Sequence, residues 1–133
     1  RYFIDNCHHK PVFNGDIFSV ENFEIRKAQF PHINTWMLGR GILMNPFLPA
    51  EIKGKTYSST DKKLMLKTFH QRIFEEYSVK LDNQGNVLNK MKQFWMYFSS
   101  NFPENEKVFK RIKKANSEFM YKAEVGSIFN TLM

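Results

Sequence analysis

Two short apolar runs, each followed by a glycine turn, constrain the fold of this chain more than any other feature. The first run, Pro11-Val12-Phe13, stops at Asn14-Gly15-Asp16, and the second, Thr35-Trp36-Met37-Leu38, stops at Gly39-Arg40-Gly41. Between them, residues 20–30 have their apolar side chains at helical spacing. A strand, a helix and a strand in this order predict a parallel β-α-β unit, which belongs to the α/β folds.

The glycine turns follow the carboxyl ends of the two predicted strands, which is the edge where α/β proteins bind ligands. Glycine has no Cβ, so the backbone at these turns can approach a ligand closely. Two neighbouring turns, one of them with Arg40, predict a phosphate site made of N–H groups and a guanidinium. In the alternative interpretation Asn14-Gly15 and Gly39 are only turn residues. The spaced pair together with Arg40 favours the phosphate site.

These motifs resemble those of a known family. The sequences NGDIFS (residues 14–19) and WMLGRGILMNPFL (residues 36–48) resemble the end of the flavin barrel of tRNA-dihydrouridine synthases. In that family an N-G-D or N-G-E turn and a later G-R-G or G-R-A turn hold the phosphate of FMN. The resemblance also implies that NADPH reduces this FMN. Asp16 is expected to orient its turn rather than to touch the phosphate. The resemblance implies six cofactor-binding residues: Asn14, Gly15, Asp16, Gly39, Arg40 and Gly41.

The resemblance predicts a fold class of α/β followed by all-α. Residues 1–54 would form the last two β/α units of a TIM barrel, the FMN-binding (β/α)8 barrel of the family, and residues 55–133 a small four-helix bundle that binds tRNA. A TIM barrel has eight strands, so the chain is expected to be the C-terminal fragment of a larger protein and inactive alone. The catalytic cysteine of the family is expected upstream, and Cys7 does not lie at its position.

Apolar residues at helical spacing predict four amphipathic helices, which start near residues 61, 87, 104 and 122. The second is expected to bury Leu88, Met91, Trp95 and Phe98. The third is expected to turn Phe119 inward, together with Val108, Phe109, Ile112 and Ala115. NKMKQFWMYF (residues 89–98) and ENEKVFKRIKKANS (residues 104–117) resemble helices that grip tRNA in the synthase family.

Positive charge is concentrated in the second half of the chain. Residues 55–133 carry 14 Lys and Arg against 8 Asp and Glu, within a net charge of +7 for the whole chain. On the third predicted helix the basic residues form one stripe, with only Glu104, Glu106 and Glu118 nearby. Such a row can follow a phosphate backbone, whereas the alternative is an ordinary solvated face. The residues expected to contact tRNA are Lys90, Lys92, Lys107, Lys110, Arg111 and Lys114.

The remaining features narrow the class of protein. A single cysteine, Cys7, excludes an internal disulfide and fits a reducing compartment. No apolar run is long enough to cross a membrane. A metal site or a nucleophile pair at Cys7-His8-His9 is disfavoured because adjacent residues do not converge easily. The sequence therefore predicts a cytoplasmic protein without a metal or a membrane anchor, whose exposed barrel edges favour self-association.

The hypothesis from sequence is a fragment of a flavin-dependent tRNA-dihydrouridine synthase, which reduces a specific uridine in tRNA. Two alternatives remain open. One is an FMN barrel oxidoreductase that acts on a small molecule. The other is a basic helical RNA-binding module without catalysis.

Overall fold

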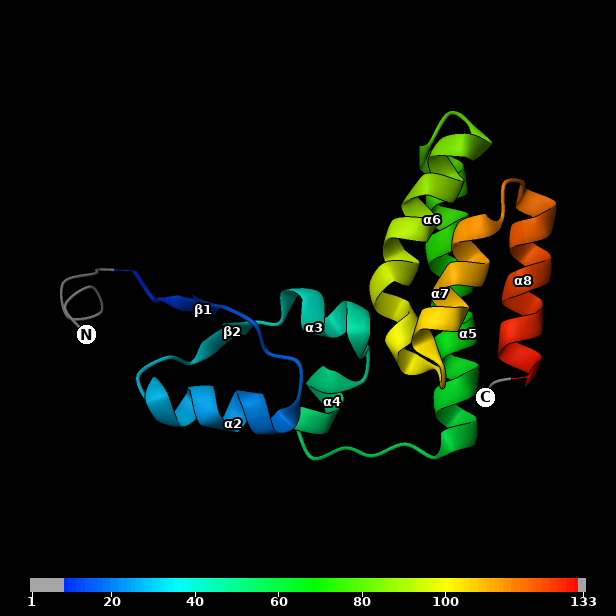
Figure 1. Cartoon of the computed structure of the whole chain (residues 1–133). Helices are drawn as coiled ribbons and strands as arrows, with labels where there is room; N and C mark the ends of the chain where they lie inside the picture. The colour runs from blue at the N-terminus through cyan, green and yellow to red at the C-terminus, as the bar shows by residue number, and fades with distance from the viewer. Residues whose placement is uncertain (1–8, 132–133) are drawn as a thin grey trace. The chain divides into compact units, whose positions relative to one another are not determined.

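The chain divides into two compact units, residues 1–55 and 56–133. The computed structural model describes residues 9–131, and Figure 1 shows their helices and strands along the chain. Cys7 and His8, where the sequence disfavours a metal site or a nucleophile pair, lie outside the described residues.

Unit 1 contains the β-α-β arrangement. Strands β1 (Val12–Asn14) and β2 (Thr35–Met37) pair in parallel, with Phe13 opposite Trp36. Helix α2 (Val20–Gln29) connects them, and two short helices, α3 (Gly39–Met44) and α4 (Leu48–Ile52), follow β2. Ser19 caps α2, because its extended backbone lets Oγ accept a hydrogen bond from the Asn22 N–H at 3.1 Å.

The core of unit 1 lies on one face of the two-stranded sheet. The rings of Phe13 and Trp36 are 5.1 Å apart, and Phe23 of α2 meets Trp36 edge to face at 5.2 Å. Ile17 and Leu48 complete this small core. Strand side chains alternate between faces, so Val12 and Met37 point the other way and are 51% and 50% exposed.

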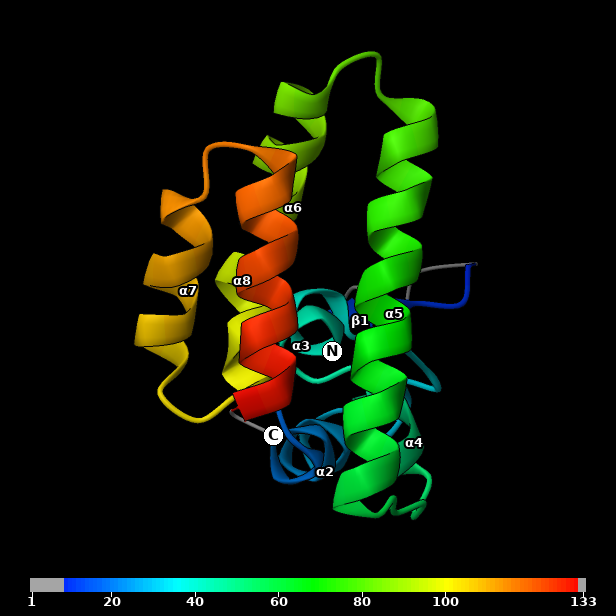
Figure 2. The ribbon, with the colours of Figure 1, turned by 90° about the vertical axis from the view of Figure 1, so that its right-hand side faces the viewer.

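Unit 2 is built from helices. Its elements are α5 (Ser59–Lys80), α6 (Gln84–Phe98), the 3₁₀ turn η1 (Ser99–Asn101), α7 (Asn105–Lys114) and α8 (Glu118–Thr131). Ser58 caps α5 and Asn83 caps α6, each with a side-chain oxygen that accepts a backbone N–H three residues ahead. The α5–α6 turn and the α7–α8 connection lie at the same end of this unit (Figure 2).

The predicted fold class is wrong. The described residues are 69% helical, with seven α-helices and a sheet of only two strands, rather than two barrel units and a four-helix bundle. Each strand has three residues, and Pro46 breaks the chain after β2 into helices of six and five residues instead of one outer barrel helix. The helices of unit 2 range from 10 to 22 residues and are interrupted by η1.

The core of unit 2 is rich in aromatic rings. The predicted inner face of α6 is confirmed, since Leu88, Met91, Trp95 and Phe98 are all buried. The prediction for Phe119 is wrong: α7 ends at Lys114, and Phe119 belongs to the start of α8, where it is 83% exposed.

One polar network crosses this aromatic core. The Tyr121 hydroxyl of α8 accepts a hydrogen bond from Trp95 Nε1 at 2.8 Å and lies 2.7 Å from His70 Nε2 of α5. A neutral His70 that accepts at Nε2 satisfies every group in this arrangement. Burial lowers the pKa of His70 to about 4, which favours this neutral form, and burial also raises the pKa of Tyr121.

Candidate functional site

The two glycine turns meet at one edge of the sheet in unit 1. Asn14 and Met37 form the last pair of the parallel register. Gly15 and Asp16 continue the chain beyond Asn14, and Leu38 leads from Met37 into α3. The six residues predicted to bind a cofactor therefore come together from two separate stretches of sequence.

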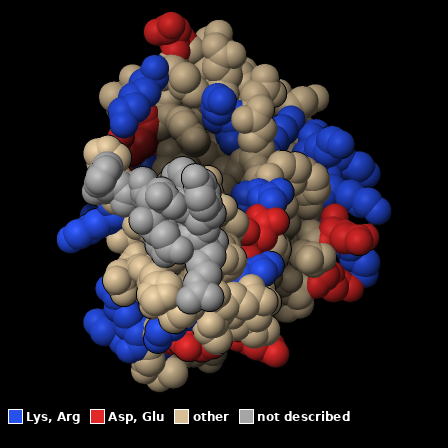
Figure 3. Space-filling model, turned by 90° about the vertical axis from the view of Figure 1, so that its left-hand side faces the viewer, with Lys and Arg blue, Asp and Glu red and all other residues tan. Residues whose placement is uncertain are grey.

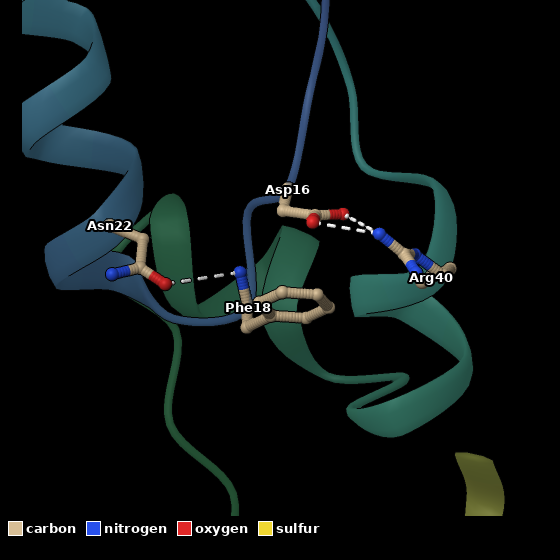
Figure 4. Close-up of polar contacts among 4 residues, drawn as sticks. All are labelled: Asp16, Phe18, Asn22 and Arg40. Carbon is tan, nitrogen blue, oxygen red and sulfur yellow. Dashed lines mark hydrogen bonds and ion pairs between the residues drawn. The ribbon is translucent and has the colours of Figure 1, made fainter. Parts of the chain in front are cut away.

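An ion pair connects the two turns. Arg40 Nη2 donates to both carboxylate oxygens of Asp16, at 2.6 and 2.7 Å, across 24 positions of sequence (Figure 4). Both side chains are more than half exposed, so the pair contributes at most about 1 kcal/mol to stability. Its value lies in geometry, because it fixes the guanidinium over the Asn14-Gly15-Asp16 turn.

The backbone at Gly41 leaves no room for a side chain. A Cβ at this position would lie 1.9 Å from the Ile17 carbonyl oxygen, so only glycine allows α3 to pack so closely on the segment after β1. Gly39 has a φ of +28°, in the region that favours glycine. The G-R-G sequence therefore has two distinct structural reasons for its glycines.

Phe18 and Asn22 are part of this edge and were not identified from sequence. The Phe18 N–H donates to Asn22 Oδ1 at 3.4 Å, and the Arg40 guanidinium lies 6.0 Å from the Phe18 ring centre (Figure 4). An open hollow beside Asp16 is lined by Phe18, Asn22, Ile25 and Arg26. Phe18 lies within the NGDIFS motif, which was the available signal.

The groups at this edge can bind an anion, but the Asp16 carboxylate competes with such an anion for Arg40. The first N–H groups of any helix lack partners within that helix, and here they lie next to a guanidinium. Asp16 occupies Nη2 of Arg40, so an incoming phosphate would share or displace that carboxylate. Asp16 was predicted to orient its turn or to cap a neighbour, and in the structure its carboxylate pairs with Arg40.

The basic stripe of α7 separates into two groups of side chains. Lys107 pairs with Glu104, and Arg111 donates from Nε to Glu124 at 2.8 Å and from Nη2 to Ser127 at 2.9 Å, so Arg111 faces α8. Glu124 and Ser127 were missed as partners because they follow Arg111 by 13 and 16 residues and belong to the next helix. Three lysines are exposed without an ion pair to any described residue: Lys110, Lys113 and Lys114.

The two lysines of α6 do not share a face. At 3.6 residues per turn, positions two apart point about 160° away from each other. Lys90 and Lys92 therefore flank the buried Met91 on opposite sides, and one RNA strand along one helix face meets only one of them. On the face shown in Figure 3, both Lys and Arg and Asp and Glu side chains are exposed.

Within residues 9–131 no group of three or more His, Cys, Asp or Glu side chains is arranged to hold a metal ion. None of the described helices combines the length and apolar character needed to cross a bilayer.

Comparison with known proteins gives no further guide to identity. No family model, no curated protein and no solved structure matches this chain.

Proposed function

We propose that this chain serves in the flavin-dependent reduction of a uridine in tRNA, as part of a tRNA-dihydrouridine synthase. Unit 1 would hold the phosphate of FMN, and unit 2 would bind the tRNA backbone. The proposal rests on the local arrangement of side chains and not on a barrel architecture.

One observation carries the proposal: the N-G-D and G-R-G turns, far apart in sequence, are joined by the Asp16–Arg40 contact at 2.6 Å. The parallel register already brings the two turns to one sheet edge, and the ion pair adds the Arg40 guanidinium to that edge. Glycine at position 41 lets α3 pack closely against the segment after β1, which keeps the two turns together.

Each residue of the site has a defined task in this proposal. Backbone N–H groups at Gly39, Arg40 and Gly41 would donate to the phosphate, and the Arg40 guanidinium would neutralise its charge. Asn14 and Gly15 would form the opposite wall, and Asp16 would hold Arg40 in position. The chemistry that FMN would supply at this site, after reduction by NADPH, is hydride transfer to the uridine ring. The proton donor expected from the resemblance is not among these residues.

The lysines of α7 support the RNA part of the proposal. Lys110, Lys113 and Lys114 are exposed, and no described carboxylate neutralises them. Contacts of this kind position an RNA without reading its sequence, and they make binding weaken as salt rises. A uridine must leave its stack to reach a flavin, so the enzyme needs a grip on the RNA elsewhere.

The experiment is an absorbance spectrum of the purified full-length protein after incubation with FMN. We expect a flavin spectrum that Arg40→Glu abolishes and that Lys53→Glu retains, since Lys53 makes the same change of charge in unit 1 outside the two turns. A protein that takes up no FMN would refute the flavin part of the proposal.

A second candidate is an RNA-binding helical module without catalysis. The favouring observation is that the three lysines belong entirely to unit 2, which has its own core. Salt-dependent tRNA binding by a full-length protein that never binds FMN would establish this candidate in place of the first.

A further inference from the structure

Phe119 is the most exposed aromatic side chain in the part of unit 2 that the structure describes. It is 83% exposed at the second residue of α8, and Met120 beside it is 44% exposed. The other aromatic rings of the core pack among themselves, such as Phe94 against Phe98 at 4.6 Å. Packing therefore does not explain why this position has a phenylalanine.

The surroundings of Phe119 are cationic on one side. Only three residues separate the last residue of α7, Lys114, from the first of α8. Five residues of extended chain span at most about 18 Å, so Lys114 lies within that distance of Phe119. In one strand of a nucleic-acid helix, phosphates follow one another about every 3.4 Å along the axis. A distance of about 18 Å therefore corresponds to about five phosphates.

Acidic groups lie at the first residue of α8 and at the α5–α6 turn. Glu118 pairs with Lys122 of its own helix, and it borders a hollow that also contains Asp82 at the α5–α6 turn. Both helix connections lie at this end of unit 2 (Figure 2). Phosphates are therefore favoured on the α7 side of Phe119 and disfavoured toward Asp82.

We propose that Phe119 is a stacking platform for an unpaired base of the RNA whose phosphates bind Lys110, Lys113 and Lys114. This inference rests on the proposed RNA contact of unit 2 and identifies the feature it recognises, a single-stranded or extruded nucleotide. Aromatic side chains beside a cationic track are how proteins bind unpaired nucleic acid, because every base offers a π face.

A protein partner fits this surface less well. Protein interfaces are enriched in aromatic residues and methionine but depleted of lysine. Lys113, Lys114 and Asn116 precede Phe119 by three to six residues, and all three are exposed and polar or charged. A nucleic acid complements this surface, because its phosphates match the lysines and its planar bases match the exposed ring of Phe119.

The test measures the affinity of the 133-residue chain for a labelled tRNA transcript by fluorescence anisotropy, at several salt concentrations. Phe119→Ala should bind roughly 5- to 150-fold more weakly with an unchanged salt dependence, as expected for the loss of one stacked base. Phe119→Trp should bind at least as well as the original chain. Leu64→Ala is the matched control, because it also removes an exposed apolar side chain, near the start of α5 and far from the α5–α6 turn. It should leave the affinity for tRNA unchanged.

A second variant separates the inference from the proposal beneath it. Lys110→Glu, Lys113→Glu and Lys114→Glu together should weaken binding and also flatten its salt dependence. If the original chain binds and Phe119→Ala binds equally well, the stacking inference is wrong while the RNA contact stands. If the original chain does not bind tRNA, both are wrong. A loss of self-association in Phe119→Ala, with tRNA affinity unchanged, would identify the surface as a protein contact and refute stacking.

Discussion

The two units of this chain differ in whether the candidate site overlaps with the hydrophobic core. Among the described residues, unit 1 buries five apolar side chains and unit 2 buries fifteen. In unit 1 the core and the candidate site share the same turns, so a change at the site disturbs the fold. In unit 2 the basic residues lie on the outer surface of α7, away from the aromatic core. The comparison shows that surface charge can vary without cost to packing, whereas the glycine turns cannot.

The largest expected effect is on the core of unit 2. Trp95→Ala removes a fully buried ring and leaves Tyr121 without its donor, so it should lower the free energy of unfolding by about 3–5 kcal/mol. Chemical denaturation followed by circular dichroism measures this change. Met96→Ala, at a half-exposed neighbour, should cost much less. Equal losses in the two variants would contradict the assignment of the core.

Acid should destabilise unit 2 through His70. Its pKa is about 4 in the folded chain and about 6.5 when unfolded, so between these values the unfolded state binds the proton and the folded state does not. Stability is then complete above pH 6.5 and falls by up to about 3 kcal/mol as the pH decreases to 4. Unfolding at pH 7 and pH 4.5 measures the loss. His70→Gln should remove this component, and His32→Gln, at an exposed site, should keep it.

Replacing a glycine with alanine should destabilise unit 1 at position 41 and stabilise unit 2 at position 126. Gly41→Ala places a Cβ 1.9 Å from a carbonyl oxygen, so unit 1 should lose about 1–3 kcal/mol and its FMN binding. Gly126→Ala on α8 meets nothing within 4 Å and should gain up to about 1 kcal/mol, because alanine favours a helix. Thermal unfolding and FMN titration test the pair. A harmless Gly41→Ala would show that the turns are not tightly packed.

The smallest expected effect on stability is at the ion pair. Asp16→Asn should change the free energy of unfolding by less than about 1 kcal/mol, because the pair is exposed. It should change FMN affinity more than stability, since the amide no longer neutralises Arg40. If affinity does not respond, Asp16 does not orient the guanidinium. Lys27→Gln, which breaks another exposed pair of unit 1, is the control.

The sequence predicted local structure better than it predicted architecture. Helical periodicity located α6 and its buried face, and the parallel register explains why the turns after Asn14 and Met37 meet. The fold class failed because the motifs fix only the loops, whereas strand length and the break at Pro46 depend on the surrounding chain.

The errors on α7 and α8 have a separate cause. Phe119 continues the apolar spacing of α7, but the backbone is extended at Ala115, and Ser117 begins a new helix by accepting the Met120 N–H at 3.2 Å. The serine cap was the available signal. The contact of Arg111 with Glu124 joins two helices and has no signature in local spacing.

The most direct test of the proposed function is the formation of dihydrouridine in a tRNA transcript treated with the full-length protein, FMN and NADPH. We predict dihydrouridine at one position of the transcript with the original protein, and none with Arg40→Glu, while Lys53→Glu remains active. If a protein that binds FMN leaves every uridine unchanged, or if Arg40→Glu is fully active, the proposed function is contradicted.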